Sequence, residues 1–138
     1  MSDFSLTTFG ESGELGQVRH ALTAVGNGET TVGIRAKNGI VIAAEKKLPT
    51  PLADETSIHK IENLCNYMGV TYSGIGPDFQ AMLLKARKDI QVYHARYQDR
   101  ITPFMVSKAV ADVIQEYTQS GGVRPFGIGM IVGGFDED

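Results

Sequence analysis

The sequence predicts an α+β protein, and three observations lead to this class. A segment with helical spacing of apolar residues comes first, four short strand-like segments follow, and two long helical segments precede a last apolar strand. Strands in one block and helices in another are typical of α+β layering rather than of alternating βαβ units. An Asn38-Gly39 pair between two of the strand-like segments indicates a β-hairpin. The two long helices are therefore expected to cover one face of a sheet.

The amino-terminal part is expected to form an arm and a helix. Residues 1–11 are polar and rich in turn formers, so they are predicted as an extended arm. Residues 12–25 are predicted as the opening helix, because Leu15, Val18, Leu22 and Val25 share one face. Ser12 is the expected N-cap, and the glycines around Asn27 are expected to end the helix.

Four strands should follow. Residues 30–36 alternate, with Val32, Ile34 and Ala36 on one side, and the run IVIAAE forms the other half of the hairpin. Both turn residues tolerate the positive φ of a type I′ turn. Residues 48–57 are expected to be a loop, since their two prolines cannot donate to a ladder. Two short strands are expected around 58–61 and 68–73.

Two helices and a strand should complete the chain. The long helix is predicted to open at residues 74–78, with an inner face of Phe79, Met82, Ala86, Ile90, Tyr93 and Tyr97. The next helix is predicted to open at Thr102-Pro103, with threonine as the cap and proline in the first turn. Its inner face would carry Val106, Val110, Val113 and Tyr117, and Gly121-Gly122 would end it. Residues 126–135 are predicted as a buried strand.

The composition indicates one globular domain and gives no reason to expect nucleic acid or a membrane as a partner. The chain has 138 residues, of which 42% are hydrophobic and 21% charged, and its formal net charge is −3. These values are typical of a globular protein, and a negative charge does not attract phosphate backbones. The first residues lack the basic start and apolar core of a signal peptide, and no apolar run is long enough to span a bilayer. The single cysteine, Cys65, favours a reducing compartment.

Three features could bind a ligand, and each has a simpler structural interpretation. Residues 73–76, SGIG, precede a helix as an anion cradle does, but they lack the spacing of a dinucleotide-binding loop and favour an ordinary strand-to-helix turn. The basic residues of the long helix are expected to form a solvated face or a subunit contact: Lys85, Arg87, Lys88 and Arg96. The three histidines share no ligand spacing with Cys65, so no metal and no cofactor is expected.

The strand start at Thr30-Thr31 is the feature that suggests catalysis. In amino-terminal threonine hydrolases a strand begins with threonine, and the free α-amine of that residue is the base that activates its hydroxyl. An acidic residue and a lysine from later strands accompany it. Glu45 and Lys60 are the candidates for these two residues.

Strings spread over the whole chain resemble the alpha-ring subunits of the 20S proteasome. They are residues 4–25, residues 57–65 and residues 115–127, and the last of these, QEYTQSGGVRPFG, is the most specific. The strings SLTTF and YSGIGPDF favour the second eukaryotic alpha type. The resemblance implies the αββα sandwich of amino-terminal nucleophile hydrolases. Because members of the family are longer, residues 1–138 are expected to be a single partial domain, truncated before the carboxy-terminal part of that sandwich.

The resemblance also implies a non-catalytic subunit. Set against the Thr-Thr-Thr-Val-Gly start of beta subunits, the position of the nucleophile falls on Glu29, and the nitrogen of Thr30 lies in a peptide bond. No residue is therefore expected to be catalytic. The implied role is ring assembly, substrate gating and activator docking in ubiquitin-dependent protein degradation, in cytoplasm and nucleus. The implied partners are the other alpha subunits of a seven-membered ring, the beta-ring subunits, and activators or the regulatory particle.

Two alternatives remain open. One is a catalytic threonine peptidase of the beta type, and the other is a truncated polypeptide that binds ring subunits without a gating function.

Three groups of site residues follow from the resemblance. Ser120, Gly121, Gly122 and Val123 would line the annulus at the entry to the barrel, where glycine lets backbones approach closely, with Arg124 and Pro125 anchoring the turn. Lys60 would lie in the activator pocket and receive the terminal carboxylate of an activator tail. The gate arm would include Asp3, Phe4, Glu11 and His20. Of the tyrosine, aspartate, proline and tyrosine that hold the gate in this family, only the aspartate is retained, as Asp3.

Overall fold

A computed structural model describes residues 9–136 and has the element order that the sequence predicts. One helix is followed by four strands, two long helices and a last strand, with a short 3-10 helix before the third strand. The elements are α1 (Gly16–Gly26), β1 (Thr31–Arg35), β2 (Ile40–Ala44), η1 (Glu55–Ser57), β3 (Ile61–Cys65), β4 (Met68–Gly74), α2 (Gly76–Tyr97), α3 (Pro103–Gln119) and β5 (Ile128–Gly134). The predicted α+β class is confirmed.

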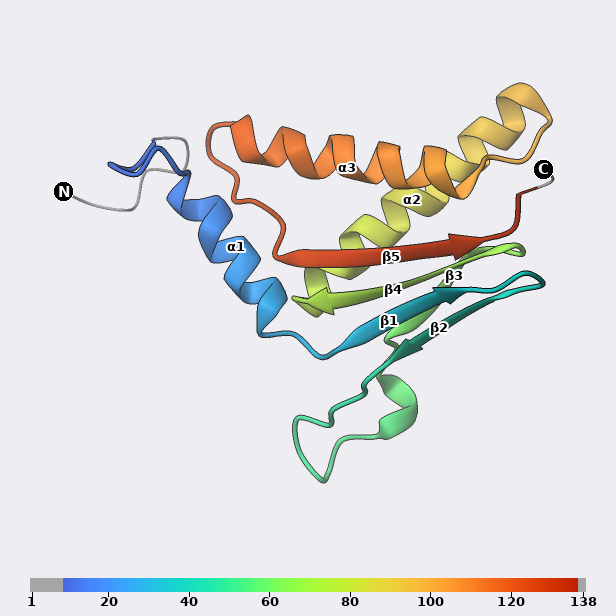
Figure 1. Cartoon of the computed structure of the whole chain (residues 1–138), viewed down its shortest axis with the longest axis horizontal. Coiled ribbons are helices and arrows are strands. Elements are labelled where there is room, and N and C mark those ends of the chain that lie inside the picture. The colour runs from blue at the N-terminus through green and yellow to red at the C-terminus, as the bar shows by residue number, and fades with distance from the viewer. Residues whose placement is uncertain (1–8, 137–138) are drawn as a thin grey trace.

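The elements are arranged in three layers (Figure 1). The central layer is an antiparallel sheet in the order β3-β4-β5, in which Val70 of β4 lies opposite Val132 of β5. Helices α2 and α3 cover one face of this sheet, and the hairpin of β1 and β2 lies against the other. Ile42 of the hairpin packs directly over Gly69 and Gly133, where the lack of side chains lets the two sheets approach. The described residues thus form two sheets face to face with helices outside one of them.

The core lies between the central sheet and the two long helices. Val70 and Phe79 are fully buried, and Met82, Leu83 and Val106 are nearly so. The ring of Tyr72 stacks on that of Phe79 with the ring centroids 4.1 Å apart. The predicted inner face of α2 is confirmed for four residues, which are buried: Phe79, Met82, Ala86 and Ile90. Tyr97 was predicted on this face but is exposed, and Leu83 is buried although it was not predicted there. Tyr97 is the last residue of α2, and its ring lies against that of Tyr93, with the ring centroids 4.7 Å apart.

The opening helix is shorter than the predicted range 12–25. It begins at Gly16 with Leu15 in the N-cap position, so the prediction of Ser12 as N-cap is wrong. Residues 10–14 form a tight turn instead, closed by the hydrogen bond from the Gly10 amide to the Glu14 carbonyl at 2.8 Å and by a positive φ at Gly13. The predicted stop is confirmed, because Asn27 is the C-cap and donates to Thr23.

Two strand predictions need correction. The strand expected around 58–61 begins only at Ile61, because residues 55–57 form a 3-10 turn capped by the Asp54 side chain. The hairpin itself is confirmed, but neither Asn38 nor Gly39 has a positive φ, so the type I′ turn is wrong. The hydrogen bond from the Ala36 amide to the Gly39 carbonyl closes this turn.

The start of α3 is confirmed, and its end lies slightly earlier than predicted. The Thr102 hydroxyl accepts from the Met105 amide at 3.2 Å, and Pro103 occupies the first turn. The helix ends at Gln119 with Ser120 as the C-cap, so the glycine pair lies just outside it.

Candidate functional site

The turn between α3 and β5 is anchored at its base by Arg124. Its guanidinium donates to both oxygens of Asp78, at 2.6 and 2.7 Å, and the Gly127 amide donates to the same carboxylate at 3.0 Å. Asp78 lies in the first turn of α2 and is buried, whereas Arg124 is 57% exposed. The hydrogen bonds from Arg124 and Gly127 hold the pKa of Asp78 below its ordinary value. One carboxylate therefore joins the start of α2 to the end of this turn.

The residues predicted for the annulus form the exposed tip of the same turn. Gly121 and Gly122 are exposed, and a methyl group added to either would meet no atom within 4 Å. Gly122 has φ +82°, a conformation that glycine adopts without strain. Ser120 donates back to the Glu116 carbonyl, and Val123 is half-buried. The structure thus brings Ser120, Gly121, Gly122 and Val123 together as a projecting turn on a fixed base.

A second turn, residues 73–76, is held by the same segment. Gly74 has φ +107°, and a side chain there would collide with the carbonyl oxygen of Gly127. That carbonyl accepts from the Ile75 amide at 2.9 Å. The Ile75 amide is therefore occupied within the chain, and the segment is a strand-to-helix turn.

Lys60, the residue predicted for the activator pocket, is buried. It lies directly before β3, is only 7% exposed, and places its ammonium 4.0 Å from the centroid of the Tyr72 ring. Its Nζ donates to Oε2 of Glu29 at 3.3 Å. A hydrogen bond from the backbone of Glu29 and the hydrogen bond from the Lys60 ammonium lower the pKa of the Glu29 carboxyl. Burial and the Glu29 charge raise the pKa of Tyr72.

The residues that suggested catalysis have other partners in the structure. Thr30 follows Glu29 in an ordinary peptide bond, and its carbonyl accepts from the Glu45 amide at 2.8 Å. Lys60 contacts Glu29, the residue that precedes Thr30. Helix α1 is fixed ahead of this strand, because the Ser73 hydroxyl donates to the Val25 carbonyl at 2.9 Å. A docked helix rather than a free amine therefore precedes Thr30.

The predicted gate arm is only partly described. Asp3 and Phe4 lie outside the described residues. Glu11 lies in the turn before α1, and His20 lies on α1 itself; both are exposed. The main-chain bridge between Phe9 and Leu15 brings the end of the arm back to the start of the helix.

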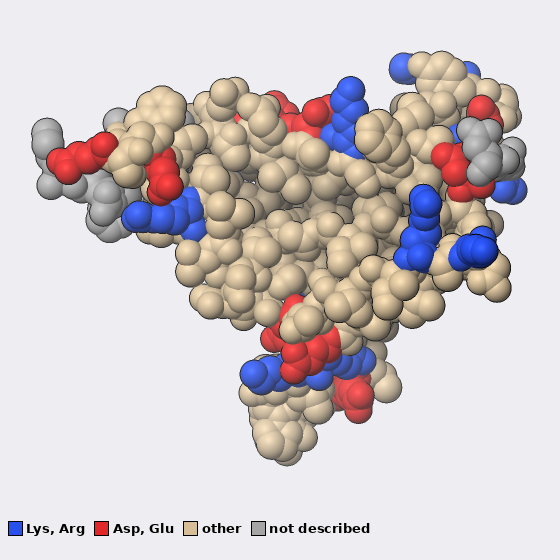
Figure 2. All heavy atoms as spheres, in the orientation of Figure 1, with Lys and Arg blue, Asp and Glu red and all other residues tan. Residues whose placement is uncertain are grey.

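Two of the basic residues of α2, Lys85 and Arg87, have partners within the chain. Arg87 donates to the Asn63 carbonyl and to the carboxylate of Glu62, and Lys85 pairs with Asp89 one turn further on. Figure 2 shows basic and acidic side chains intermixed at the edges of one face, with a broad uncharged area between them. Within residues 9–136 no group of His, Cys, Asp or Glu could hold a metal ion, and no helix is long and apolar enough to cross a membrane.

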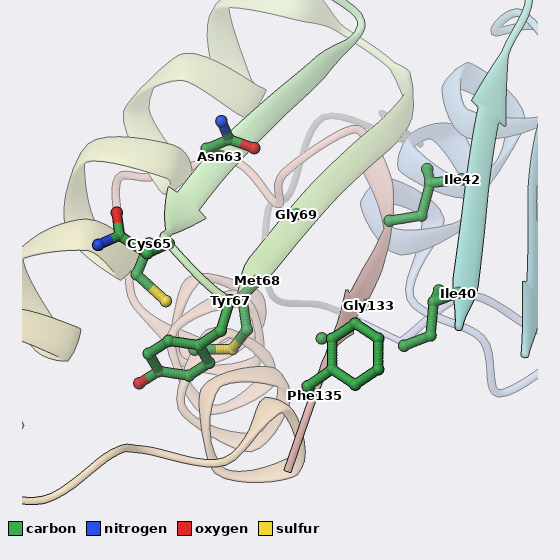
Figure 3. A pocket seen from close by; sticks show the side chains of 11 residues that line it. Ile40, Ile42, Asn63, Cys65, Tyr67, Met68, Gly69, Gly133 and Phe135 are labelled. Atoms are coloured by element: carbon green, nitrogen blue, oxygen red, sulfur yellow. The ribbon is translucent and has the colours of Figure 1, made fainter. Parts of the chain in front are cut away.

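A cavity of about 280 Å³ lies between the hairpin and the central sheet, away from Lys60. Ile40 and Ile42 border it from the hairpin, Met68 borders it from the sheet, and Phe135 borders it from the segment after β5 (Figure 3). Cys65 also lines this cavity and is half-buried.

The sequence did not predict two ion-pair partners. These are Asp78, which pairs with Arg124, and Glu29, which pairs with Lys60. An acidic residue is a recognisable signal of a helix start, because the helix dipole stabilises a negative charge in the first turn. The partner of that residue, 46 positions away along the chain, could not be read from local spacing.

These features define a layered α+β protein with a projecting glycine turn and a buried lysine that is paired with a half-buried glutamate. The sequence profile of the family described as proteasome subunit matches residues 25–138, and the chain belongs to this family.

The curated relatives that the chain matches include alpha type-2 subunits. It is 53% identical over 135 residues to "Proteasome subunit alpha type-2" of Oryza sativa subsp. japonica, covering 98% of this chain and 57% of the relative. It is 53% identical over 134 residues to the type-2-A subunit of Arabidopsis thaliana, covering 97% and 57%, and 47% identical over 135 residues to the type-2 subunit of Drosophila melanogaster, covering 98% and 58%. The chain therefore spans 57 to 58% of the length of these relatives.

Proposed function

We propose that the chain is a non-catalytic alpha-ring subunit of the 20S proteasome core. The observation that carries this proposal is the 53% identity to alpha type-2 subunits, spread over 98% of the chain. The subunit would contribute to ring assembly, substrate gating and activator docking in ubiquitin-dependent protein degradation. Its partners would be the other alpha subunits of a seven-membered ring, the beta-ring subunits, and activators or the regulatory particle. A cytoplasmic and nuclear location is part of the proposal, and the unpaired Cys65 suits these reducing compartments.

Peptide-bond cleavage in the particle would belong to other subunits. A threonine can attack a peptide only when its own α-amine is free to take the proton of its hydroxyl. The bond between Glu29 and Thr30 removes that amine, and the pairing of Lys60 with Glu29 commits the nearby ammonium to a different carboxylate. The complex as a whole would be a threonine-type endopeptidase, and this chain would be one of its structural subunits.

The projecting turn of residues 120–123 would line the entry to the barrel. This proposal is supported by a tip without bulky side chains at Gly121 and Gly122 and by a base fixed through Arg124 and Asp78. A pore constriction needs both properties, because several copies must approach one axis and each must keep its place. The arm of residues 1–11, with Asp3, Phe4 and Glu11, and His20 beside it on α1, would contribute to the gate above this entry.

Lys60 would receive the terminal carboxylate of an activator tail at a pocket between neighbouring subunits. Its partly desolvated ammonium supports this role, because a charge-assisted hydrogen bond strengthens away from bulk water.

The test is affinity purification of the tagged chain from its own host, followed by mass spectrometry of what is bound. We expect alpha-ring and beta-ring subunits in stoichiometric amounts. Recovery of the chain free of other proteasome subunits, from an extract in which the particle itself is intact, would refute the proposal.

A further inference from the structure

The ammonium of Lys60 already has a carboxylate partner inside its own chain. Oε2 of Glu29 lies 3.3 Å from Nζ of Lys60, and the Tyr72 ring covers another side of the ammonium at 4.0 Å. The Tyr72 ring is itself held by stacking on Phe79. Only 7% of Lys60 is exposed, so a second carboxylate cannot reach the ammonium while both neighbours stay in place.

Glu29 is held where it meets Lys60 by the backbone on both sides. Gly28 packs so closely against Ser73 and Gly74 that no side chain would fit there. On the other side, the Thr30 carbonyl accepts from the Glu45 amide at 2.8 Å. The side chain of Glu29 itself is 32% exposed. Its main chain is therefore fixed, whereas its carboxylate has room to turn away toward solvent.

We propose that Glu29 is an internal ligand of Lys60, which competes with the terminal carboxylate of an activator tail for the same ammonium. This inference rests on the proposed role of Lys60 in activator docking. Glu29 thereby determines how strongly this subunit's pocket binds a tail, and docking here requires its carboxylate to leave.

The competition follows from the chemistry of the two ligands. Both are carboxylates, so both gain the same kind of charge-assisted hydrogen bond from the ammonium. After displacement from Lys60, the Glu29 carboxylate still has a second cation nearby, because the charge of Lys47 also lowers the pKa of Glu29. An ion pair of this partly exposed kind is a modest barrier, so Glu29 weakens docking without preventing it.

The experiment uses the assembled core particle, purified from cells in which a variant replaces the natural chain. The probe is a short peptide copied from the carboxyl terminus of an activator, with a photo-crosslinking residue, made as the free acid and as the carboxyl-terminal amide. The yield of the adduct on this chain, followed by mass spectrometry against peptide concentration, gives an apparent Kd for this pocket alone. The variants are Glu29→Gln and Lys60→Met, which keeps the apolar stem of the lysine.

Asp89→Asn is the matched control. Asp89 forms an ion pair with Lys85 at 3.4 Å on α2, and its exposed fraction of 38% is close to the 32% of Glu29. The control therefore removes the same charge from a carboxylate of similar exposure, in a pair whose lysine is itself exposed.

We expect Glu29→Gln to tighten binding of the free acid by about two- to fivefold, as the loss of an ion pair worth up to about 1 kcal/mol would do. The amide should gain nothing, Asp89→Asn should match the natural chain, and Lys60→Met should abolish the preference for the free acid. If the free acid binds through Lys60 but Glu29→Gln leaves its Kd unchanged, the competition is refuted and the docking role stands. If no free-acid preference depends on Lys60 in either background, the docking role fails and the competition fails with it.

Discussion

At the scale of single residues, the Asp78 carboxylate joins two segments that lie far apart in the sequence. It accepts two hydrogen bonds from Arg124 and one from the Gly127 amide, while its own side chain is almost fully covered. A buried carboxylate is stable only when such donors surround it. The three hydrogen bonds therefore account for the arginine after the glycine turn and for the aspartate in the first turn of α2.

Asp78→Asn should loosen the base of the glycine turn. An amide in place of the carboxylate loses the charge and presents N–H groups to donors, so the contact should weaken by about 2 kcal/mol, which is roughly thirtyfold in amide exchange. Hydrogen–deuterium exchange of residues 126–129 in the assembled particle measures this. Asp89→Asn should change exchange there by less than twofold, since its exposed pair contributes little. Equal exchange in the two variants would show that Asp78 does not hold the turn.

The same contact predicts a dependence on pH. Arg124 and Gly127 hold the pKa of folded Asp78 below its ordinary value of 3.8, so the unfolded segment binds a proton more readily than the folded one. The stabilisation is then fully present above 3.8 and is lost as pH falls through the lower, folded value. Exchange of residues 126–129, corrected for its intrinsic pH dependence, should stay flat from about pH 8 to pH 5 and rise below about pH 4. Asp78→Asn should abolish the rise, and a rise that persists in this variant would assign it to another group.

At the scale of elements, the turn between β4 and α2 allows no side chain at Gly74. A left-handed φ costs a residue other than glycine about 1–2 kcal/mol, and the collision with the Gly127 carbonyl adds to this. Gly74→Ala should therefore separate the start of α2 from β5 and reduce incorporation into the particle severely. Native gels of cells that express the tagged variant beside the natural chain measure the incorporated share.

Gly16→Ala is the control for this prediction. Gly16 lies in the first turn of α1, where an added methyl group would meet no atom within 4 Å, so incorporation should equal that of the natural chain. Incorporation of Gly74→Ala at the same level would contradict the structural role of this turn.

The sequence predicted elements best where local signals were strong. Thr102-Pro103 at the start of α3, the stop at Asn27 and the hairpin around Asn38-Gly39 all lie where they were expected. Ser12 had the right chemistry for a cap, but glycines on both sides of it favoured a tight turn, and the helix began later. The register of β3 depends on its partner β4 and on the turn at η1, which local spacing does not encode.

The candidate site was predictable only in part for the same reason. Residues 120–123 could be placed in one turn because they are contiguous. The arginine after them was predicted to anchor this turn. The partner of that arginine, Asp78, and the partner of Lys60, Glu29, are 46 and 31 positions away. Contacts of this length are decided by how the sheets and helices pack, and a single sequence does not display them.

At the scale of the whole molecule, the outer face of the hairpin is apolar and open to water. Val32, Ile34 and Val41 are 49%, 64% and 63% exposed, and Ile34 lies directly opposite Val41. Full burial of such a side chain contributes about 1.5–3 kcal/mol, against a total stability of about 5–15 kcal/mol for a typical domain. Within the described residues β1 pairs only with β2, so the hairpin also leaves strand edges unpaired, which favours aggregation.

The 138 residues expressed alone should therefore be molten or insoluble. We expect them to bind a hydrophobic dye and to unfold without a cooperative transition in calorimetry. Replacing Ile34 and Val41 by threonine should reduce dye binding, because it removes apolar surface from this face without changing the strand preference. A sharp thermal transition of a monomer in the natural chain would show that these residues close a stable core by themselves.

Mass spectrometry of the purified particle after treatment with a threonine-directed covalent inhibitor tests the central claim most directly. The claim is that this chain is a ring subunit without peptidase activity. We predict that the chain is recovered with alpha-ring and beta-ring subunits, that the beta-ring subunits gain the mass of the inhibitor, and that this chain keeps its own mass with Glu29 and Thr30 still joined. A stoichiometric adduct on Thr30 or Thr31 of a chain cleaved at that bond would contradict the claim and identify the chain as a catalytic subunit.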